Sequence, residues 1–112
     1  MEKKNKIPRR KRCYNSGKIG GINYLHALRK FRDADNIIHT MGMHPVNPMN
    51  NGLKPSRPYW MHMAVDILML ATCGNIFLQK DWRQSRGARI EYRIARFMGL
   101  TVWEGDNRGI DK

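Results

Sequence analysis

Residues 75–92 read NIFLQKDWRQSRGARIEY, and this stretch decides the fold. A short apolar run at 75–78 precedes a periodic segment that reaches Met98, which predicts a strand, a loop and the start of a helix. Ser85 is suited to cap that helix, and Gly87 leaves room for another group to approach the backbone. The free N–H groups of the first helical turn would then face a place where anions bind.

Strand and helix patterns alternate along the rest of the chain. The predicted strands are 13–16, 43–46, 75–78 and 100–103, and the predicted helices are 23–41, 59–71 and 86–98. No hairpin signal joins consecutive strands, and such alternation is typical of a parallel sheet with helices on both faces. We therefore expect a small doubly wound α/β fold, Rossmann-like or flavodoxin-like, with four to five strands. Ligands of such sheets bind beyond the carboxyl ends of the strands, where Gly17 should meet the loop 82–87.

The length and charge of the chain indicate one small basic domain. The chain has 112 residues, and 21 Lys and Arg against 9 Asp and Glu give a net charge of +12. We predict the domain over residues 11–104, with a disordered basic arm at 1–10 and a polar tail at 105–112. The arm is either merely solvated or in weak contact with nucleic acid.

Small size also favours self-association, because a small domain buries little apolar surface alone. We expect a homodimer or a higher homo-oligomer. Tyr59 and Trp60 belong either to such an interface or to the core, and we favour the core.

The cysteines and histidines fit no metal-ligand or redox spacing. Cys13 and Cys73 are far apart in the sequence and are expected to be free thiols within packed elements. We expect no metal and no cofactor, and we place the histidines on the surface or in loops: His26, His39, His44 and His62. Because no signal peptide or apolar run of bilayer length is present, we expect a cytoplasmic protein without membrane contact.

Two carboxylates stand on apolar helix faces. Glu91 shares a face with Ala88 and Ala95, and Asp66 is the one charged residue within 63–71. Burying an unpaired carboxylate is costly, so each acid needs a partner or a cleft, and its pKa should rise unless it is paired. Two interpretations remain open for Glu91: an ion pair with a neighbouring arginine, or a place in a hollow shared with Asp66.

Five motifs in order resemble the small nucleoside 2-deoxyribosyltransferase-like domains. They are YNSGKIGG at 14–21, Asn47-Pro48, Asp66 with Leu70 and Cys73, Trp82-x-x-Ser85-x-Gly87-Ala88-x-x-Glu91, and Ala95 with Gly99. The resemblance covers roughly residues 11–103. It is closest to an uncharacterised phage and bacterial branch catalogued as domain of unknown function 4406, and more distant to the 2'-deoxynucleoside 5'-monophosphate N-glycosidases.

The resemblance implies roles for individual residues. Glu91 matches the nucleophile that attacks the anomeric carbon of a deoxyribosyl group, and Asp66 matches the acid that assists the departing base. Ser85 matches the position that holds a 5'-phosphate in the monophosphate-specific relatives. The positions expected to bind substrate are Ser16, Gly17, Lys18, Asn47, Trp82, Ser85 and Gly87.

The chain departs from the family at Gly74, where an acid usually contributes near the base or the sugar. Two functions therefore remain open. One is an enzyme that cleaves or exchanges the N-glycosidic bond of a (deoxy)nucleoside or its 5'-monophosphate. The other is a non-catalytic protein that captures a nucleotide or nucleotide signal, as a phage-type sponge does. Arg83, Arg86 and Arg89 favour the second function, because arginine suits multiply charged phosphates.

Overall fold

A four-stranded parallel sheet forms the centre of the computed structural model, which describes residues 6–105. The strands are β1 (Arg12–Ser16), β2 (His44–Val46), β3 (Asn75–Leu78) and β4 (Thr101–Glu104). Their order across the sheet is β2-β1-β3-β4, and every neighbouring pair is parallel. The predicted parallel α/β fold is confirmed.

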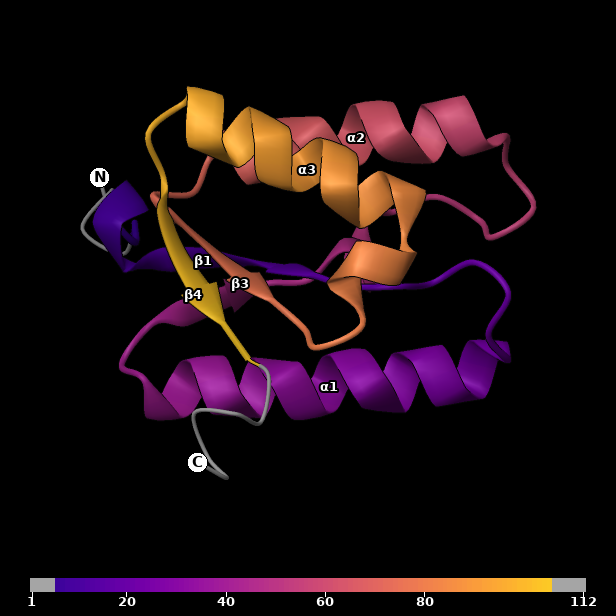
Figure 1. The fold of residues 1–112 in the computed structure, drawn as a ribbon, viewed down its shortest axis with the longest axis horizontal. Coiled ribbons are helices and arrows are strands. Elements are labelled where there is room, and N and C mark those ends of the chain that lie inside the picture. The colour runs from indigo at the N-terminus through magenta and orange to yellow at the C-terminus, as the bar shows by residue number, and fades with distance from the viewer. Residues whose placement is uncertain (1–5, 106–112) are drawn as a thin grey trace.

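Three helices cover the two faces of the sheet (Figure 1). Helix α1 (Tyr24–Thr40) lies on one face, and α2 (Tyr59–Ala71) and α3 (Arg86–Phe97) lie together on the other. Because helices cover both faces of the sheet, every residue of β3 is buried. Its sequence therefore lacks the alternation of apolar and polar residues that is typical of a strand with one face in water. No helix within residues 6–105 combines the length and apolar character needed to cross a membrane.

The core has two layers, because successive strand residues point to opposite faces. On the α1 side, Cys13 and Phe77 pack against Ala34 and Ile38. On the other side, the buried cluster consists of Tyr14, Val46, Leu70, Cys73, Ile76, Leu78, Trp82, Ala88, Ala95 and Leu100. Both cysteines are buried free thiols, as predicted.

The loops after β1, β2 and β3 leave the same edge of the sheet, and side chains cap the segments that follow them. Asn23 Oδ1 accepts hydrogen bonds from the backbone N–H groups of Leu25 and His26 at the start of α1. Ser85 Oγ accepts one from Ala88 N at 3.1 Å, so the predicted cap of α3 is confirmed. The loop before α3 contains a short 3-10 turn, η4 (Trp82–Gln84), which the sequence analysis did not predict.

The chain before β1 packs against the opposite edge of the sheet. Arg9–Lys11 form a 3-10 turn, and the carbonyl oxygen of Arg9 accepts a hydrogen bond from Gly74 N at 2.8 Å. The arm expected to be disordered over 1–10 is therefore ordered at Arg9 and Arg10. The arm's first residues, 1–5, and the tail residues 106–112 lie outside the described part of the chain.

The prediction that Tyr59 and Trp60 belong to the core is wrong. Tyr59 is 57% exposed and Trp60 is 69% exposed in the single chain. Trp60, Ala64 and Leu68 follow one another at intervals of four residues, so they form an exposed apolar stripe along α2.

We expect Gly74→Ala to destabilise the fold. A Cβ at position 74 would lie 2.7 Å from the carbonyl oxygen of Arg9, so one of the two backbone segments must move. The free energy of unfolding in urea should fall by about 1–3 kcal/mol. Gly20→Ala is the matched control, because its Cβ would meet no atom within 4 Å. Equal stability of the two variants would show that the contact with Arg9 is unimportant.

Candidate active site

A cavity of about 330 Å³ lies beyond the carboxyl ends of the central strands. Its walls come from the loops after β1 and β2, from α2 and from the first turns of α3. Both Asp66 and Glu91 line this cavity, so the two acids share one hollow, as the sequence suggested. The location agrees with the ligand position usual in open parallel sheets.

Glu91 is buried, and two hydroxyl groups hold its carboxylate. Tyr14 Oη donates a hydrogen bond to Oε2 and Ser16 Oγ donates one to Oε1, each at 2.8 Å. Tyr14 and Ser16 are two residues apart on β1, so they face the same side of the sheet. Within residues 6–105, no salt bridge reaches Glu91. The structure therefore supports the cavity interpretation of this acid and not the arginine ion pair.

The environment of Glu91 favours its neutral form at moderately acidic pH. Burial raises the pKa of Glu91 from its ordinary value of 4.5 to about 7. The hydrogen bonds from Ser16 and Tyr14 lower the pKa, because they favour the charged form, and the nearby charge of Asp66 raises it. Near neutral pH, both the ionised and the protonated carboxyl are therefore populated.

Asp66 belongs to a chain of polar contacts along the other wall. Asn51 Nδ2 donates to Asp66 Oδ1 at 2.9 Å and also lies 3.1 Å from His62 Nδ1. His62 Nε2 lies 3.1 Å from the carbonyl oxygen of Lys54, which accepts a hydrogen bond from it. Burial raises the pKa of Asp66 to about 6, whereas the Asn51 hydrogen bond and the His62 charge lower it.

Three residues of this site were not predicted from the sequence. Tyr14 and Asn51 were not expected to contact the acids, and His62 was expected on the surface or in a loop. His62 lines the cavity, half-buried, one helical turn before Asp66. The interval of four residues within 59–71 was an available signal, because such residues share a helix face. The other histidines, His26, His39 and His44, are exposed.

The predicted substrate-binding residues fall into two groups. Gly17, Ser85 and Gly87 line the cavity, and Ser16 lies behind it against Glu91. A Cβ at Gly87 would lie 3.1 Å from Tyr59 Oη, so this glycine allows α2 and α3 to approach at the cavity wall.

Lys18, Asn47 and Trp82, also predicted to bind substrate, do not line the cavity. Asn47 Nδ2 donates to Asp35 Oδ2 at 3.0 Å, and Asn47 Oδ1 caps the short turn that follows β2. Trp82 is buried, with its ring 4.7 Å from that of Tyr92. Lys18 Nζ approaches the carbonyl oxygen of Gln84 at 3.4 Å. The partners of these three side chains lie outside the cavity. Their contacts therefore hold the surrounding loops in place.

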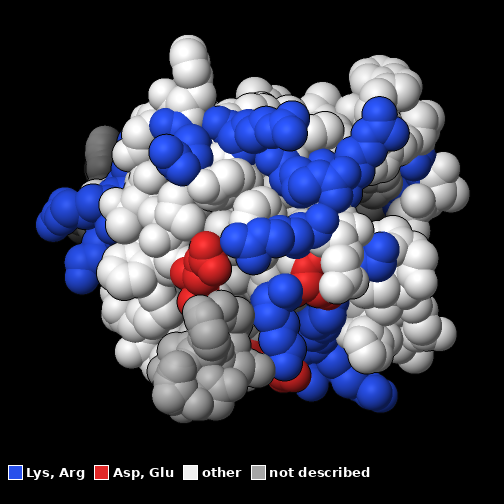
Figure 2. Space-filling view, in the orientation of Figure 1, with Lys and Arg blue, Asp and Glu red and all other residues white. Residues whose placement is uncertain are grey.

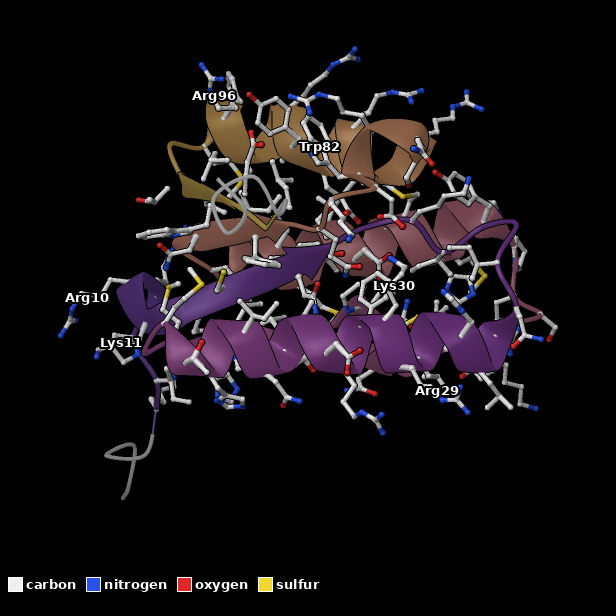
Figure 3. The ribbon with its side chains drawn as sticks, turned by 60° about the horizontal axis from the view of Figure 1, so that its bottom comes forward. Arg10, Lys11, Arg29, Lys30, Trp82 and Arg96 are labelled. Carbon is white, nitrogen blue, oxygen red and sulfur yellow. The ribbon has the colours of Figure 1, made fainter. Side chains whose placement is uncertain are left out.

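A second polar network fastens the loops on the α1 side of the sheet. Lys30 points from α1 toward the sheet, where its ammonium forms an ion pair with Asp81 at 3.1 Å and a hydrogen bond with Gln79 (Figure 3). Gln79 Nε2 donates to Asn15 Oδ1 at 2.6 Å. A Cβ at Gly17 would lie 2.5 Å from the Gln79 side chain, so glycine is needed where this network meets the cavity.

The positions of Gly74 and of the arginines differ from expectation. Gly74 lies at the amino end of β3, at the edge of the sheet opposite the cavity, so an acid there would not reach a bound base or sugar. Arg83, Arg86 and Arg89 are exposed and do not line the cavity, whereas Arg57 does. The argument that these three arginines favour capture of a nucleotide is therefore not supported.

The fold and site define a small all-parallel α/β domain with two buried acids in one cavity. The chain belongs to the family described as Domain of unknown function (DUF4406), whose model matches residues 11–104. A search of curated proteins finds no match. Within residues 6–105, no group of three or more His, Cys, Asp or Glu side chains is placed to hold a metal ion.

We expect Glu91→Gln to stabilise the protein at alkaline pH. The folded pKa of about 7 lies above the ordinary value of 4.5, so the folded state binds more protons between these values and stability falls as the pH rises through this window. Glutamine keeps the shape of the side chain without the charge. Urea denaturation at about pH 8 should show a gain on the order of 2 kcal/mol, which shrinks below about pH 4.5.

Glu104→Gln is the matched control for this measurement. It makes the same chemical change on an exposed side chain of β4, so its effect should be small at both pH values. A gain for Glu91→Gln that is independent of pH would contradict the assignment of a raised pKa to Glu91.

Proposed function

We propose that the cavity binds a nucleoside or nucleotide and that Glu91 attacks its anomeric carbon to break the N-glycosidic bond. The observation that carries this proposal is a buried carboxylate, oriented by two hydroxyl groups, in a cavity that it shares with Asp66. The resemblance to the nucleoside 2-deoxyribosyltransferase-like domains supports the choice of substrate. The substrate would be a (deoxy)nucleoside or its 5'-monophosphate.

The proposed reaction has two displacements at C1'. An ionised oxygen of Glu91 bonds to C1' while the C1'–N bond breaks, and its electron pair leaves with the base, which takes a proton from Asp66. Water then attacks C1' of the glycosyl-enzyme, gives its proton to Asp66 and releases Glu91. A second base in the place of water would make the protein a transferase.

The productive form of the pair carries one proton, on Asp66 and not on Glu91. Tyr14 and Ser16 support this form, because their hydroxyl groups donate to the charged Glu91. Burial acts against it, because it raises the pKa of Glu91 to about 7, which is above the pKa of about 6 that Asp66 has, so the proton favours Glu91. The two acids therefore titrate as a pair, and only part of the singly protonated population has the proton on Asp66.

The remaining walls of the cavity are consistent with a nucleoside or nucleotide. Its volume of about 330 Å³ lies at the small end of ligand pockets. Apolar and aromatic side chains suited to a base and a sugar include Ile19, Tyr24, Met49, Leu53 and Met63. Ser85, the N-terminal end of α3 and Arg57 offer donors and positive charge for a 5'-phosphate.

We also propose that the chain associates with further copies of itself through α2. The stripe of Trp60, Ala64 and Leu68 leaves large apolar surfaces exposed, with Trp60 and Leu68 at 69% and 68%. Tyr59, next to this stripe, lines the cavity. A second copy packed on the stripe would therefore lie beside the cavity mouth.

We expect Glu91→Gln to stop base release. Incubation with a panel of nucleosides and 5'-monophosphates, followed by chromatography for free base, should show a loss of at least about a thousandfold. Ligand binding should change little, since glutamine keeps the size of the side chain, and Glu104→Gln should release base at the normal rate. Undiminished release by Glu91→Gln would exclude Glu91 as the nucleophile. A ligand retained in mass spectra without any base release by the unaltered chain would identify a binding protein.

Base release should follow a bell-shaped pH profile with a maximum between about pH 6 and 7. Below this range both acids are protonated and Glu91 cannot attack, and above it Asp66 has no proton to give. Asn51→Ala removes a hydrogen bond that lowers the pKa of Asp66, so the alkaline limb should move to higher pH. An unchanged alkaline limb, measured from kcat/KM, would mean that Asp66 is not the proton donor.

A further inference from the structure

The outer face of α3 carries a row of arginines. Arg86, Arg89, Arg93 and Arg96 follow at intervals of three and four residues, so they share one face of the helix. Arg83, in η4, continues the row beyond the start of α3. All five side chains belong to exposed residues, and Figure 2 shows the resulting band of positive charge across this face of the molecule.

No acid within residues 6–105 forms an ion pair with this arginine row. The acid of α3 is Glu91, which is buried on the opposite side of the helix. The salt bridge formed within residues 6–105 joins Lys30 to Asp81, two residues before Arg83, and includes no arginine of the row. Like charges one turn apart destabilise a helix, and a positive charge in the first turn, as at Arg86, opposes the helix dipole. No ion pair offsets the repulsion between these like charges, so the row is available for a role outside folding.

Several of the five guanidinium groups are held in place before any partner binds. Arg83 lies over the ring of Trp82 at 4.9 Å, and Arg96 donates to Tyr92 Oη at 2.8 Å. Arg89 donates to the carbonyl oxygen of Arg83 at 2.8 Å. Such ordering reduces the conformational entropy that long side chains lose on binding, so a charged partner is bound more tightly.

We propose that the arginine row of α3 binds the phosphate backbone of double-stranded nucleic acid. From Arg86 to Arg96 the helix rises about 15 Å, and a duplex presents one backbone charge per about 1.7 Å of its axis, so several phosphates lie within reach. Guanidinium groups pair well with phosphate oxygens. This surface is formed by residues of η4 and α3. The proposal does not depend on the reaction in the cavity.

The row is suited to the backbone of a duplex more than to unpaired bases. Proteins that bind single strands stack bases on exposed aromatic rings. Here the ring of Trp82 is buried, and Arg83 and Arg96 lie over the rings of Trp82 and Tyr92. Phe97, 92% exposed, is the one exposed ring of α3, so the row offers a single place for a base to stack. Contacts to phosphates alone carry little sequence information, so we expect binding that is independent of sequence and strongly dependent on salt.

The opposite face of the molecule provides a matched control. Arg29 and Arg32 are exposed on α1, three residues apart, but Asp33 follows Arg32 directly, so the charge there is mixed. Figure 3 shows Arg29 and Arg96 on opposite sides of the sheet. Removing Arg29 and Arg32 takes away the same charge as removing two arginines of the row.

The test measures the affinity of the full chain for a fluorescent DNA duplex of about 20 base pairs at a series of salt concentrations. Each contact with a phosphate adds to the slope of log K against log salt. Arg86→Gln with Arg93→Gln removes two guanidiniums that make no hydrogen bond within residues 6–105. We expect affinity at about 0.1 M salt to fall at least tenfold and the slope of log K against log salt to weaken by about 2. Arg29→Gln with Arg32→Gln should leave the slope unchanged.

Three results would overturn the proposal. The first is an equal loss of affinity and slope in the two double variants, which would show only a response to net charge. The second is tighter binding to a single strand of the same length than to the duplex. The third is the absence of duplex binding at about 0.05 M salt, where such electrostatic contacts are strong. If phosphatidylserine vesicles then bind the chain through Arg86 and Arg93, the partner of the row is a membrane surface and not a duplex.

Discussion

The pair of hydrogen bonds from Tyr14 and Ser16 to Glu91 is the interaction on which the rest of the structure depends. A carboxylate on the inner face of α3 would be very unfavourable without partners, and both partners come from the central strand β1. Ala88 and Ala95 flank Glu91 on this face, and their small side chains let α3 lie close enough for the contact. The same contact sets one wall of the cavity, so the packing of α3 and the geometry of the site have one origin.

Local patterns were sufficient to predict most of the fold. The bounds predicted for α2 and β3 agree with the structure, because a continuous apolar run and a proline at position 58 are local signals. The turn at Arg9–Lys11 was missed, because it is stabilised by a hydrogen bond to Gly74, far away in the sequence. The exposure of Trp60 was also missed, since an aromatic residue in an apolar helix does not reveal which face meets solvent.

The candidate site was predictable only in part. Asp66 and Glu91 stand out in the sequence because each places a charge on an otherwise apolar helix face. Both carboxylates are buried in the structure, as this pattern indicated. Their partners do not stand out, because Tyr14 lies 77 positions from Glu91 and Asn51 belongs to a loop. The sequence also did not reveal that Asn47 and Trp82 lie outside the cavity lining. A motif locates a residue along the chain, whereas the direction of its side chain depends on contacts such as those with Asp35 and Tyr92.

Helix α3 separates two electrostatic environments that would otherwise interfere. Its inner face holds the acid whose pKa is raised, and its outer face holds the arginine row, within one helix diameter of each other. Cations so close would lower the pKa of Glu91 if they shared its surroundings, yet burial, two hydroxyl groups and Asp66 determine that pKa. Water and salt screen the exposed guanidiniums, whereas the buried carboxyl is little screened. A polyanion bound outside would therefore change the protonation of Glu91 only slightly, so the proposed surface binding and the proposed reaction in the cavity would be independent of each other.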